Sequence, residues 1–194
     1  MSEKKINVKN VHFAEITETE STITHGTPEL VAGAMEVVRT PTIATGQLFG
    51  DGKISDSNSK KTAYQIQIQH NRIPSKWRRI MEGTTIVTGV ESGTSSDVPK
   101  PVAVGWEVEK TNGESELIWF LYCKATPTEE RVQQSTENIT YSTDTLTLTA
   151  LEHDLLERFY TMIDTEETTV TEAMVTDFFK KVQTTDTIAA PAAG

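Results

Sequence analysis

The sequence predicts a mainly β fold with an antiparallel β-sandwich or barrel-like core. Residues 102 to 108 alternate apolar side chains with smaller or polar ones, the period of two that indicates a strand with one buried face. Asn112-Gly113 follows, and this pair in a two-residue loop is the strongest short-range signal of a hairpin, because both positions take positive φ. Threonine is over-used, often in alternation, which suits half-buried strand surfaces.

The return strand of this hairpin, predicted over residues 117 to 125, is apolar on both faces. Strict alternation places Leu117, Trp119, Leu121 and Cys123 on one face and Ile118, Phe120 and Tyr122 on the other. Such a strand is central and needs a cover on both sides, from a second sheet, a helix or a partner subunit. A third strand is predicted from Ile139 to Thr149, with Tyr141, Thr143, Thr145 and Thr147 on the face opposite Leu146 and Leu148.

Before this hairpin the sequence predicts three shorter strands and one long loop. The strands cover residues 6–17, 21–27 and 34–40, and Pro41 is expected to close the last of them. Residues 42–61 are crowded with Gly, Ser, Asp and Asn and predict a loop whose length is uncommon in a compact domain. We therefore expect this loop to be either functional or disordered in the isolated chain.

The strand predicted at 61–71 has the most regular alternation in the chain. Tyr64, Ile66 and Ile68 form one face, and Gln65, Gln67 and Gln69 form the other. Glutamine can line a wet interface or a passage without adding a strong electric field.

A short flanking helix is predicted at about 74–82. Pro74 has the fixed φ of a first helical turn, and Gly83 suits the left-handed cap that ends a helix. Its apolar face consists of Trp77, Ile80 and Met81. The basic side chains Lys76, Arg78 and Arg79 are more typical of a solvated face than of a nucleic-acid site, which usually has far more basic surface.

The C-terminal part predicts a strand followed by a helix. Residues 155–163 fit a helical stripe as well as a strand, and we favour a strand over 156–163. Thr169 and Glu172 form a capping box that predicts a helix at about 170–182, whose Phe178-Phe179 pair is typical of an element that docks. The tail, 183–194, is expected to be mobile, so that residues 1–182 form a single domain.

Composition excludes several classes of function. A formal net charge of -10 argues against tight nucleic-acid binding, and the single Cys123 excludes an intramolecular disulfide. The four histidines have no metal-ligand spacing, and the sequence contains no nucleophile motif and no glycine-rich phosphate loop. We expect no catalytic, cofactor-binding or metal site. The start of the chain leads into no apolar segment, so a cytosolic product without membrane contact is expected.

The order and spacing of these parts resemble the major tail protein family of long, non-contractile-tailed bacteriophages, the siphophages. The resemblance covers the chain to about Ala150 and rests on these segments: Val8 to Ala14 with Ile16-Thr17-Glu18, the Gly26-Thr27-Pro28 turn, Gly33 to Val38, Phe49-Gly50-Asp51-Gly52, the short helix, Tyr122 to Pro127, and Thr143 to Thr149. It implies a structural virion protein, not an enzyme and without a cofactor.

The resemblance also implies an assembly. Subunits of this family form hexameric rings that stack into a tail tube around a tape-measure protein, between tail-initiating and tail-terminating proteins. The tube is assembled in the host cytoplasm, and DNA later passes through it into the host without specific binding. In such a tube one sheet of each subunit joins a continuous inner barrel, and the long loop bridges subunits and rings.

Three groups of residues are candidates for this assembly. The inter-subunit loop candidates are Leu48, Phe49, Asp51, Lys53 and Ile54. The lumen is expected to be lined either by Gln65, Gln67 and Gln69 or by Thr143, Thr145 and Thr147. Phe178 and Phe179 are the candidate docking pair, either on their own domain or on a neighbour.

The alternative hypothesis is a monomeric β-sandwich module that binds a carbohydrate or host-surface ligand. Trp77, Trp106 and Trp119 would be its stacking platforms. The alternation of the strands places Trp106 and Trp119 in a core, which disfavours this hypothesis. A hydrolase is a third hypothesis, and it lacks a recognisable site.

Overall fold

The computed structural model describes residues 4–50, 53–126 and 142–188 and is mainly β, as predicted. Its strands are β1 (Lys5–Glu18), β2 (Ile23–His25), β3 (Glu29–Leu30), β4 (Ala34–Gly50), β5 (Lys53–His70), β6 (Thr85–Val87), β7 (Val90–Ser92), β8 (Val102–Lys110), β9 (Ser115–Thr126), β10 (Asp144–Leu151) and β11 (Tyr160–Asp164). Its helices are α1 (Ser75–Glu82), α2 (Glu172–Asp177) and α3 (Thr185–Ile188).

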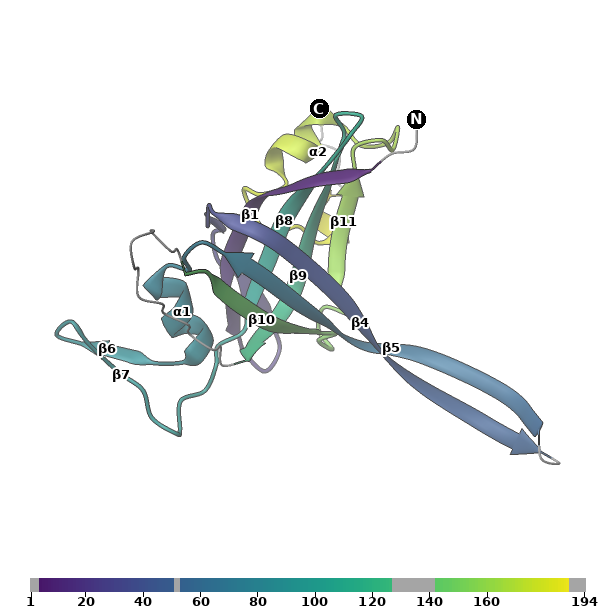
Figure 1. Cartoon of the computed structure of the whole chain (residues 1–194), viewed down its shortest axis with the longest axis horizontal. Coiled ribbons are helices and arrows are strands. Elements are labelled where there is room, and N and C mark those ends of the chain that lie inside the picture. The colour runs from purple at the N-terminus through teal and green to yellow at the C-terminus, as the bar shows by residue number, and fades with distance from the viewer. Residues whose placement is uncertain (1–3, 51–52, 127–141, 189–194) are drawn as a thin grey trace, which may run out of the picture.

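The strands form one antiparallel sheet that folds over on itself. Along it the order is β2-β1-β8-β9-β10-β5-β4, with β11 added to β9 and β3 to β1. β9 is the branch point, because its first part pairs with β8 and β11 while its last residues, 123–126, pair with β10. Beyond this point β10, β5 and β4 cross over β1, β8 and β9, giving two layers (Figure 1).

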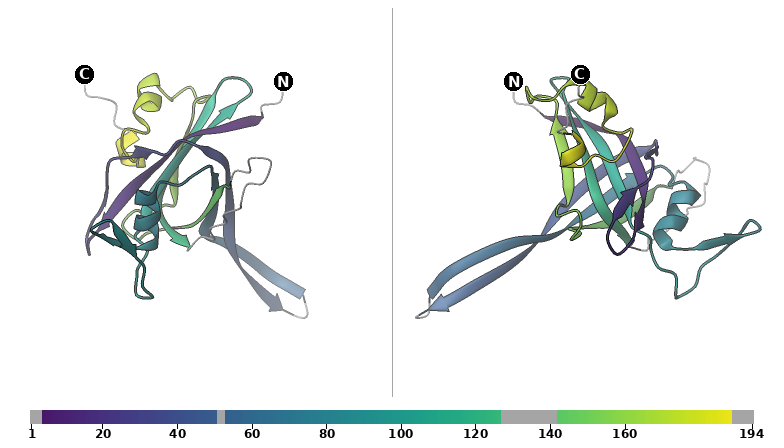
Figure 2. Two further views of the ribbon diagram at one scale, coloured as in Figure 1. Left: turned by 60° about the vertical axis from the view of Figure 1, so that its left-hand side comes forward. Right: turned by 180° about the vertical axis from the view of Figure 1, so that it is seen from behind.

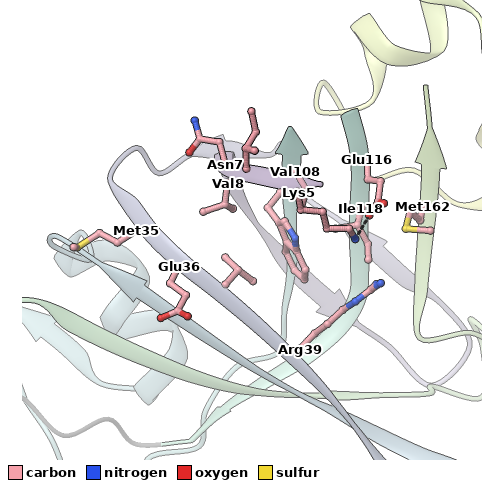
Figure 3. A pocket seen from close by; sticks show the side chains of 13 residues that line it. Lys5, Asn7, Val8, Met35, Glu36, Arg39, Val108, Glu116, Ile118 and Met162 are labelled. Carbon is pink, nitrogen blue, oxygen red and sulfur yellow. Dashed lines mark hydrogen bonds and ion pairs between the residues drawn. The ribbon is translucent and has the colours of Figure 1, made fainter. Parts of the chain in front are cut away.

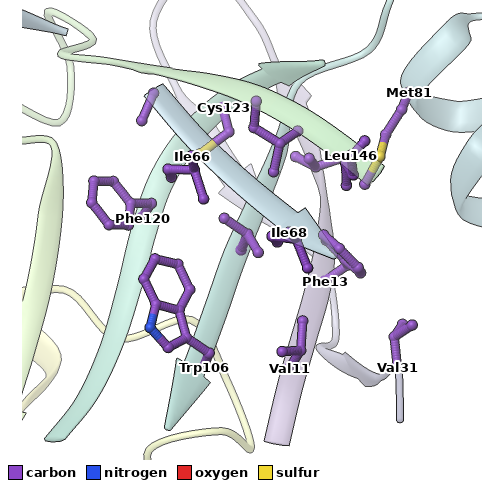
Figure 4. Close-up of a cluster of buried hydrophobic side chains, with 14 of the residues drawn as sticks. Val11, Phe13, Val31, Ile66, Ile68, Met81, Trp106, Phe120, Cys123 and Leu146 are labelled. Atoms are coloured by element: carbon purple, nitrogen blue, oxygen red, sulfur yellow. The ribbon is translucent and has the colours of Figure 1, made fainter. Parts of the chain in front are cut away.

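The main hydrophobic core lies between these two layers. Ile66 and Ile68 of β5 and Leu146 of β10 point from one layer toward Trp106 and Phe120 of the other (Figure 4). The predicted helix α1 is confirmed. It closes one end of this core with Trp77 and Met81, both 2% exposed, and ends at Gly83, whose φ of 76° is left-handed.

A second core lies on the opposite face of β1, β8 and β9, and the C-terminal segment covers it. Trp119 is fully buried there, and its indole N–H donates a 2.9 Å hydrogen bond to the backbone oxygen of Phe178. Figure 2 shows α2 and α3 over this face. Both faces of β9 are therefore covered within the chain, one by β5 and β10 and the other by residues that follow β11.

The alternation predicted along β9 is correct only as far as Leu121. Val102 pairs with Cys123 and Val104 with Phe120, so β9 contains an extra residue at this point, as in a β-bulge. The bulge exchanges the faces of the next two residues. Tyr122 joins the second core, and Cys123 joins the main core, contrary to the prediction.

The loop predicted at 42–61 is also wrong. Residues 42–50 and 53–61 belong to β4 and β5, which pair from Ala34↔His70 to Gly50↔Lys53. Pro41 lies within β4 instead of ending it, which is possible because β4 pairs only with β5 among the described strands and so is an edge strand. The Gly and Ser residues that predicted a loop belong instead to a two-stranded ribbon that projects from the body of the protein.

Other element boundaries differ for local reasons. The β8–β9 connection is longer than a two-residue loop: the Lys110 N–H donates to the Glu114 oxygen, and only Gly113, with φ 90°, is left-handed. β10 begins at Asp144, and residues 139–141 lie outside the described residues. α2 ends at Asp177, and its N-cap is Thr171, not Thr169. Residues 185–188 of the predicted mobile tail form α3, and 189–194 lie outside the described residues.

The strand predicted at 6–17 is confirmed as β1, which has one irregularity. The pairing of β1 with β8 shifts between Lys9 and His12, and Asn10 has a φ of 55°. Asparagine tolerates this left-handed conformation better than most residues do.

Gly105 provides a test of how tightly the second core is packed. A Cβ at this position would lie 2.7 Å from the Trp119 ring, whereas a Cβ at Gly46 would meet nothing within 4 Å. We expect Gly105→Ala to lower the free energy of unfolding by about 1–3 kcal/mol, because Trp119 has no room to move. Gly46→Ala, the matched control, should change it by less than about 0.5 kcal/mol. Urea unfolding of both variants checks this, and equal midpoints would contradict it.

Candidate functional site

One face of the folded-over layer is polar and almost uncharged. In the β5–β10 register, Gln65, Gln67 and Gln69 lie opposite Thr149, Thr147 and Thr145, respectively. On the other side of β5, the same glutamines lie opposite Thr40, Val38 and Glu36 of β4. The three glutamines and Thr145 are exposed, and Thr147 and Thr149 are half-buried. We call these nine residues the polar sheet face.

The two predicted lumen linings therefore belong to one surface. Cross-strand pairing places the glutamines of β5 beside Thr145 and Thr147 of β10, since opposed residues of antiparallel strands point to the same side. Thr143 is exposed but precedes β10 and has no place in its ladder. The charges at the borders of the surface are Glu36 on β4 and Lys124 on β9, and they have opposite sign.

A two-stranded ribbon extends from this face. β10 pairs with β5 only from Ala63 onward, so residues 43–50 and 53–61 pair with each other alone and project from the body (Figure 1). At about 3.3 Å per residue the projection is roughly 25 Å long. Its side chains from Ile43 to Gly46 and from Ser57 to Lys61 are exposed. An isolated ribbon of this kind is only marginally stable in water, so a partner surface would stabilise it.

The predicted inter-subunit residues lie near the far end of this ribbon. Leu48 and Phe49 belong to β4, and Lys53 and Ile54 belong to β5. Asp51 lies outside the described residues. The structure thus places four of the five candidates at the part of the chain farthest from its own core.

The structure places Phe178 and Phe179 against their own domain. They follow α2, and Phe178 is fully buried in the second core. Phe179 stacks on the His12 ring at a centroid distance of 4.6 Å and contacts Trp119 edge-on. The docking surface of this pair is thus β1, β8 and β9 of the same chain.

A buried ion-pair cluster ties the β8–β9 connection to the end of β11. Lys110 is 6% exposed, and its ammonium donates to both carboxylate oxygens of Asp164, at 2.8 and 2.7 Å. Burial alone would lower the pKa of Lys110, but hydrogen bonds to Asp164 and Glu166 outweigh it and raise the pKa above its ordinary range. The cluster holds the C-terminal segment in place.

The described residues contain no group of His, Cys, Asp and Glu side chains arranged to hold a metal ion. Cys123 is fully buried, and burial raises the pKa of its thiol well above the ordinary value, as expected of a structural cysteine. No helix within the described ranges has the length and apolar character to cross a membrane. Trp77, Trp106 and Trp119, the predicted stacking platforms, are all at most 3% exposed, so none of them presents an exposed ring face on which a carbohydrate could stack.

A groove opens between β1 and β4, where the folded-over sheet does not close. Its volume is about 540 Å³, and its apolar lining includes Ile6, Val8, Met35, Val37, Trp106 and Met162 (Figure 3). Lys5 bonds to Glu116 at 2.5 Å on one wall. Arg39, on β4, lies over the Tyr160 ring at 5.7 Å and forms no ion pair with any described residue. We call this feature the β1–β4 groove.

The hairpin of β6 and β7 is not predicted by the sequence. Its two-residue turn, Thr88-Gly89, has positive φ at both residues, 54° and 83°. This is the geometry expected of Asn-Gly turns, here with Thr at the first position. The sequence shows no turn signal here, because threonine is β-branched and rarely adopts the positive φ that this turn requires.

Comparison with known families shows which family the chain belongs to. A family model for the phage tail tube protein matches residues 42–187, which include the ribbon, the polar sheet face and the C-terminal cover. The chain belongs to the phage tail tube protein family. The protein is therefore a structural component of the virion tail, part of a homo-oligomeric assembly. No curated protein matches the chain.

Two half-buried histidines of this tail tube protein, His12 and His25, predict a pH dependence of its stability. Burial lowers the pKa of His12 and of His25 below the ordinary value of 6.5, against the opposing effect of a backbone hydrogen bond on each. The unfolded chain therefore binds protons that the folded chain does not, and stability should be full above about pH 6.5 and fall as pH drops below it.

Thermal unfolding at a series of pH values from about 7.5 to 5.5 measures this slope. The variant His12→Gln/His25→Gln should have a shallower slope over the same range, because its unfolded state gains fewer protons. Identical slopes in the two proteins would show that other groups cause the dependence.

Proposed function

We propose that this protein is the subunit of the tail tube of a siphophage, that it assembles into stacked hexameric rings, and that the polar sheet face lines the lumen through which DNA is ejected. The observation that carries the proposal is the chemistry of that face. Gln and Thr side chains hydrogen-bond water and contribute no net charge, so DNA phosphates are neither held nor strongly repelled.

The open ends of the same layer support joining between subunits. β4 pairs only with β5 among the described strands, which leaves its outer edge unpaired over residues 34–50. At the other end, the pairing of β9 with β8 stops at Cys123, so residues 124–126 have one open side. An unpaired edge is a template for another strand, and we propose that neighbouring subunits join their sheets here.

The ribbon is proposed to bridge to an adjacent subunit or ring. Its exposed Ile43 and its separation from the core leave it unsupported in the monomer. Contact with a neighbour would bury apolar surface and order the strands together, which couples folding of the ribbon to assembly.

The remaining partners follow from the proposed tube. A tape-measure protein would occupy the lumen during assembly in the host cytoplasm, and tail-initiating and tail-terminating proteins would contact the first and last rings. We further propose that residues 1–182 act as one tail-tube domain. Electron microscopy of concentrated purified protein tests the central proposal, since rings or tubes support it and a persistent monomer contradicts it.

Charge placed on the polar sheet face tests the lumen assignment. We expect Gln65→Lys/Gln67→Lys/Gln69→Lys to assemble into tubes but to slow DNA ejection at low salt, because the added ammonium groups attract phosphates; high salt should restore the rate. Thr17→Lys/Thr24→Lys/Thr27→Lys, exposed positions near β1 and β2, is the matched control. Ejection by phage carrying either variant measures the effect, and equal rates at low salt would place the lining elsewhere.

Shortening the ribbon tests its bridging role. Replacing residues 47–57 by Asn-Gly would close the hairpin at the Gly46↔Asn58 pair and leave the register below it intact. We expect a monomer that unfolds at the same temperature as wild type and that fails to form tubes, because the core residues of β5, Tyr64, Ile66 and Ile68, lie outside the replaced segment. Wild-type tubes from this variant, seen by electron microscopy, would exclude the ribbon from assembly.

A further inference from the structure

The layer that carries the polar sheet face is made of four described strands, in the order β9-β10-β5-β4. Neighbours in this layer are antiparallel, so β4 runs opposite to β9. A rotation about a tube axis keeps the direction of every strand. The end of β9 in a second copy, placed beside the outer edge of β4, is therefore antiparallel to it, and the alternation of directions continues from copy to copy.

One row of paired residues crosses this layer from edge to edge. It starts at Lys124 of β9, which lies opposite Thr149 of β10. Thr149 lies opposite Gln65 of β5, and Gln65 lies opposite Thr40 of β4. Directly opposed residues of antiparallel strands point to the same side, so all four side chains lie on the side of the polar sheet face. The register between two copies can be measured from this row.

Closing such layers into a tube displaces the row along the strands. Strands of a closed barrel tilt from its axis by about 35–45°. With about 4.8 Å between strands and about 3.3 Å per residue, this tilt offsets the row by about one residue per strand, hence by about four residues per subunit. Without an offset, Lys124 of the next copy would lie opposite Thr40. An offset of four residues moves it to Glu36 or to Ala44.

The handedness of the barrel decides between these two positions. Figure 1 shows the layer from its polar side: with β5 turned to point upward, β10 lies to its left and β4 to its right. Strands coil around a barrel in the right-handed sense, so from inside they lean to the left as they rise, and rows of paired residues climb to the right. Thr40 therefore stands higher than Lys124 of its own row, and the next copy's Lys124 meets β4 below Thr40. Because β4 runs downward in this view, the position below is Ala44.

The next pair of residues in this register is apolar. Ala125 follows Lys124 and packs against the main core, and the offset places it opposite Ile43, which is 54% exposed. Without the offset Ala125 would lie opposite Arg39 instead. Contact with Ala125 would remove part of the Ile43 side chain from water, which favours the offset register.

The start of the ribbon gains a third strand in this register. We call residues 42–46 of β4 the ribbon root. Among the described strands the ribbon root pairs only with β5, and a two-stranded ribbon is marginally stable until a further strand joins it. The other end of β4 suits an added strand less, because Met35 is an extra residue between the pairs of Ala34 and Glu36. Such a bulge interrupts the edge that a partner strand would follow.

Charges are a weaker influence on the register than strand geometry. The opposite offset would bring Lys124 beside Glu36, but an exposed ion pair contributes at most about 1 kcal/mol. In the offset toward Ala44, the nearest cation across the sheet is Lys60, which lies opposite Ala44 on β5. Lys60 would be two strands from Lys124, or about 10 Å, a distance over which salt largely screens the repulsion.

We propose that the end of β9, at Lys124, pairs with the ribbon root of the next copy of this chain, opposite Ala44 and not opposite Thr40. The proposal rests on the proposed tail-tube function and on its joining of β9 to β4. It adds the register of that joint, and it makes the ribbon root part of the joint between neighbours in a ring.

Three cysteine positions on β4 measure the register. Glu36, Thr40 and Ala44 are exposed, share one side of the strand and are spaced by four residues. Each is changed to Cys in the full chain together with Lys124→Cys; Cys123 is fully buried and stays unreactive. After assembly and mild oxidation, Lys124→Cys/Ala44→Cys should give a ladder of covalent oligomers. The two other double variants should give none, because a disulfide spans at most about 7 Å between Cα atoms and four residues of a strand span about 13 Å.

Assembly of an Ile43 variant provides a second measurement. Ile43→Ser changes an exposed side chain, so the monomer should unfold at the wild-type temperature. The protein concentration needed for tubes should rise at least about threefold, because the contact of Ile43 with Ala125 is lost. Leu155→Ser, the matched control at another exposed apolar position, should assemble like wild type.

The outcomes separate this register from the tail-tube function itself. If tubes form and the Thr40 or Glu36 variant cross-links in place of the Ala44 variant, the joint stands and the proposed register is overturned. If tubes form and no double variant cross-links, the joint of β9 with β4 is wrong. If the Ala44 variant cross-links but wild type forms no tubes, the register stands and the tail-tube proposal fails. If neither tubes nor cross-links form, both proposals fail.

Discussion

The whole structure depends on one strand that must be buried on both faces. β9 carries large apolar side chains on either side, and leaving either face in water would cost several kcal/mol for residues such as Trp119 and Phe120. The chain covers one face by folding its own sheet over and the other with the segment after β11. Neither face of β9 therefore needs a second subunit to cover it, and the described features that have no cover within the chain are strand edges, a ribbon and a groove.

Sequence periodicity predicts this fold wherever one face of an element is buried. β8, β5 and α1 follow from alternation or from cap residues, because burial selects side chains at every second or every third to fourth position. It fails along the ribbon, where the side chains of residues 43–45 and 57–61 are exposed on both faces and no burial selects the pattern. It also fails at Tyr122 and Cys123, because a bulge inserts one residue without altering the composition of the strand.

The candidate site was predictable in its chemistry but not in its arrangement. Gln65, Gln67 and Gln69 stand out in the sequence because glutamine repeats at every second position. That the threonines of β10 lie beside them depends on pairing between strands more than seventy residues apart, which no local pattern encodes. The β1–β4 groove could not be predicted from local patterns either. Its walls come from β1, β4, β8, β9 and β11, and the sequence of no single one of these strands indicates a groove.

The distribution of sulfur in the subunit has a chemical consequence. The Cys123 thiol is buried and held far from the thiolate form, so it is protected from oxidants. Met35 and Met162 are the opposite case, because their thioethers are exposed on the walls of the groove. Conversion of either to the sulfoxide would make an apolar wall polar. Oxidation would thus change the character of this groove while the buried thiol stays intact.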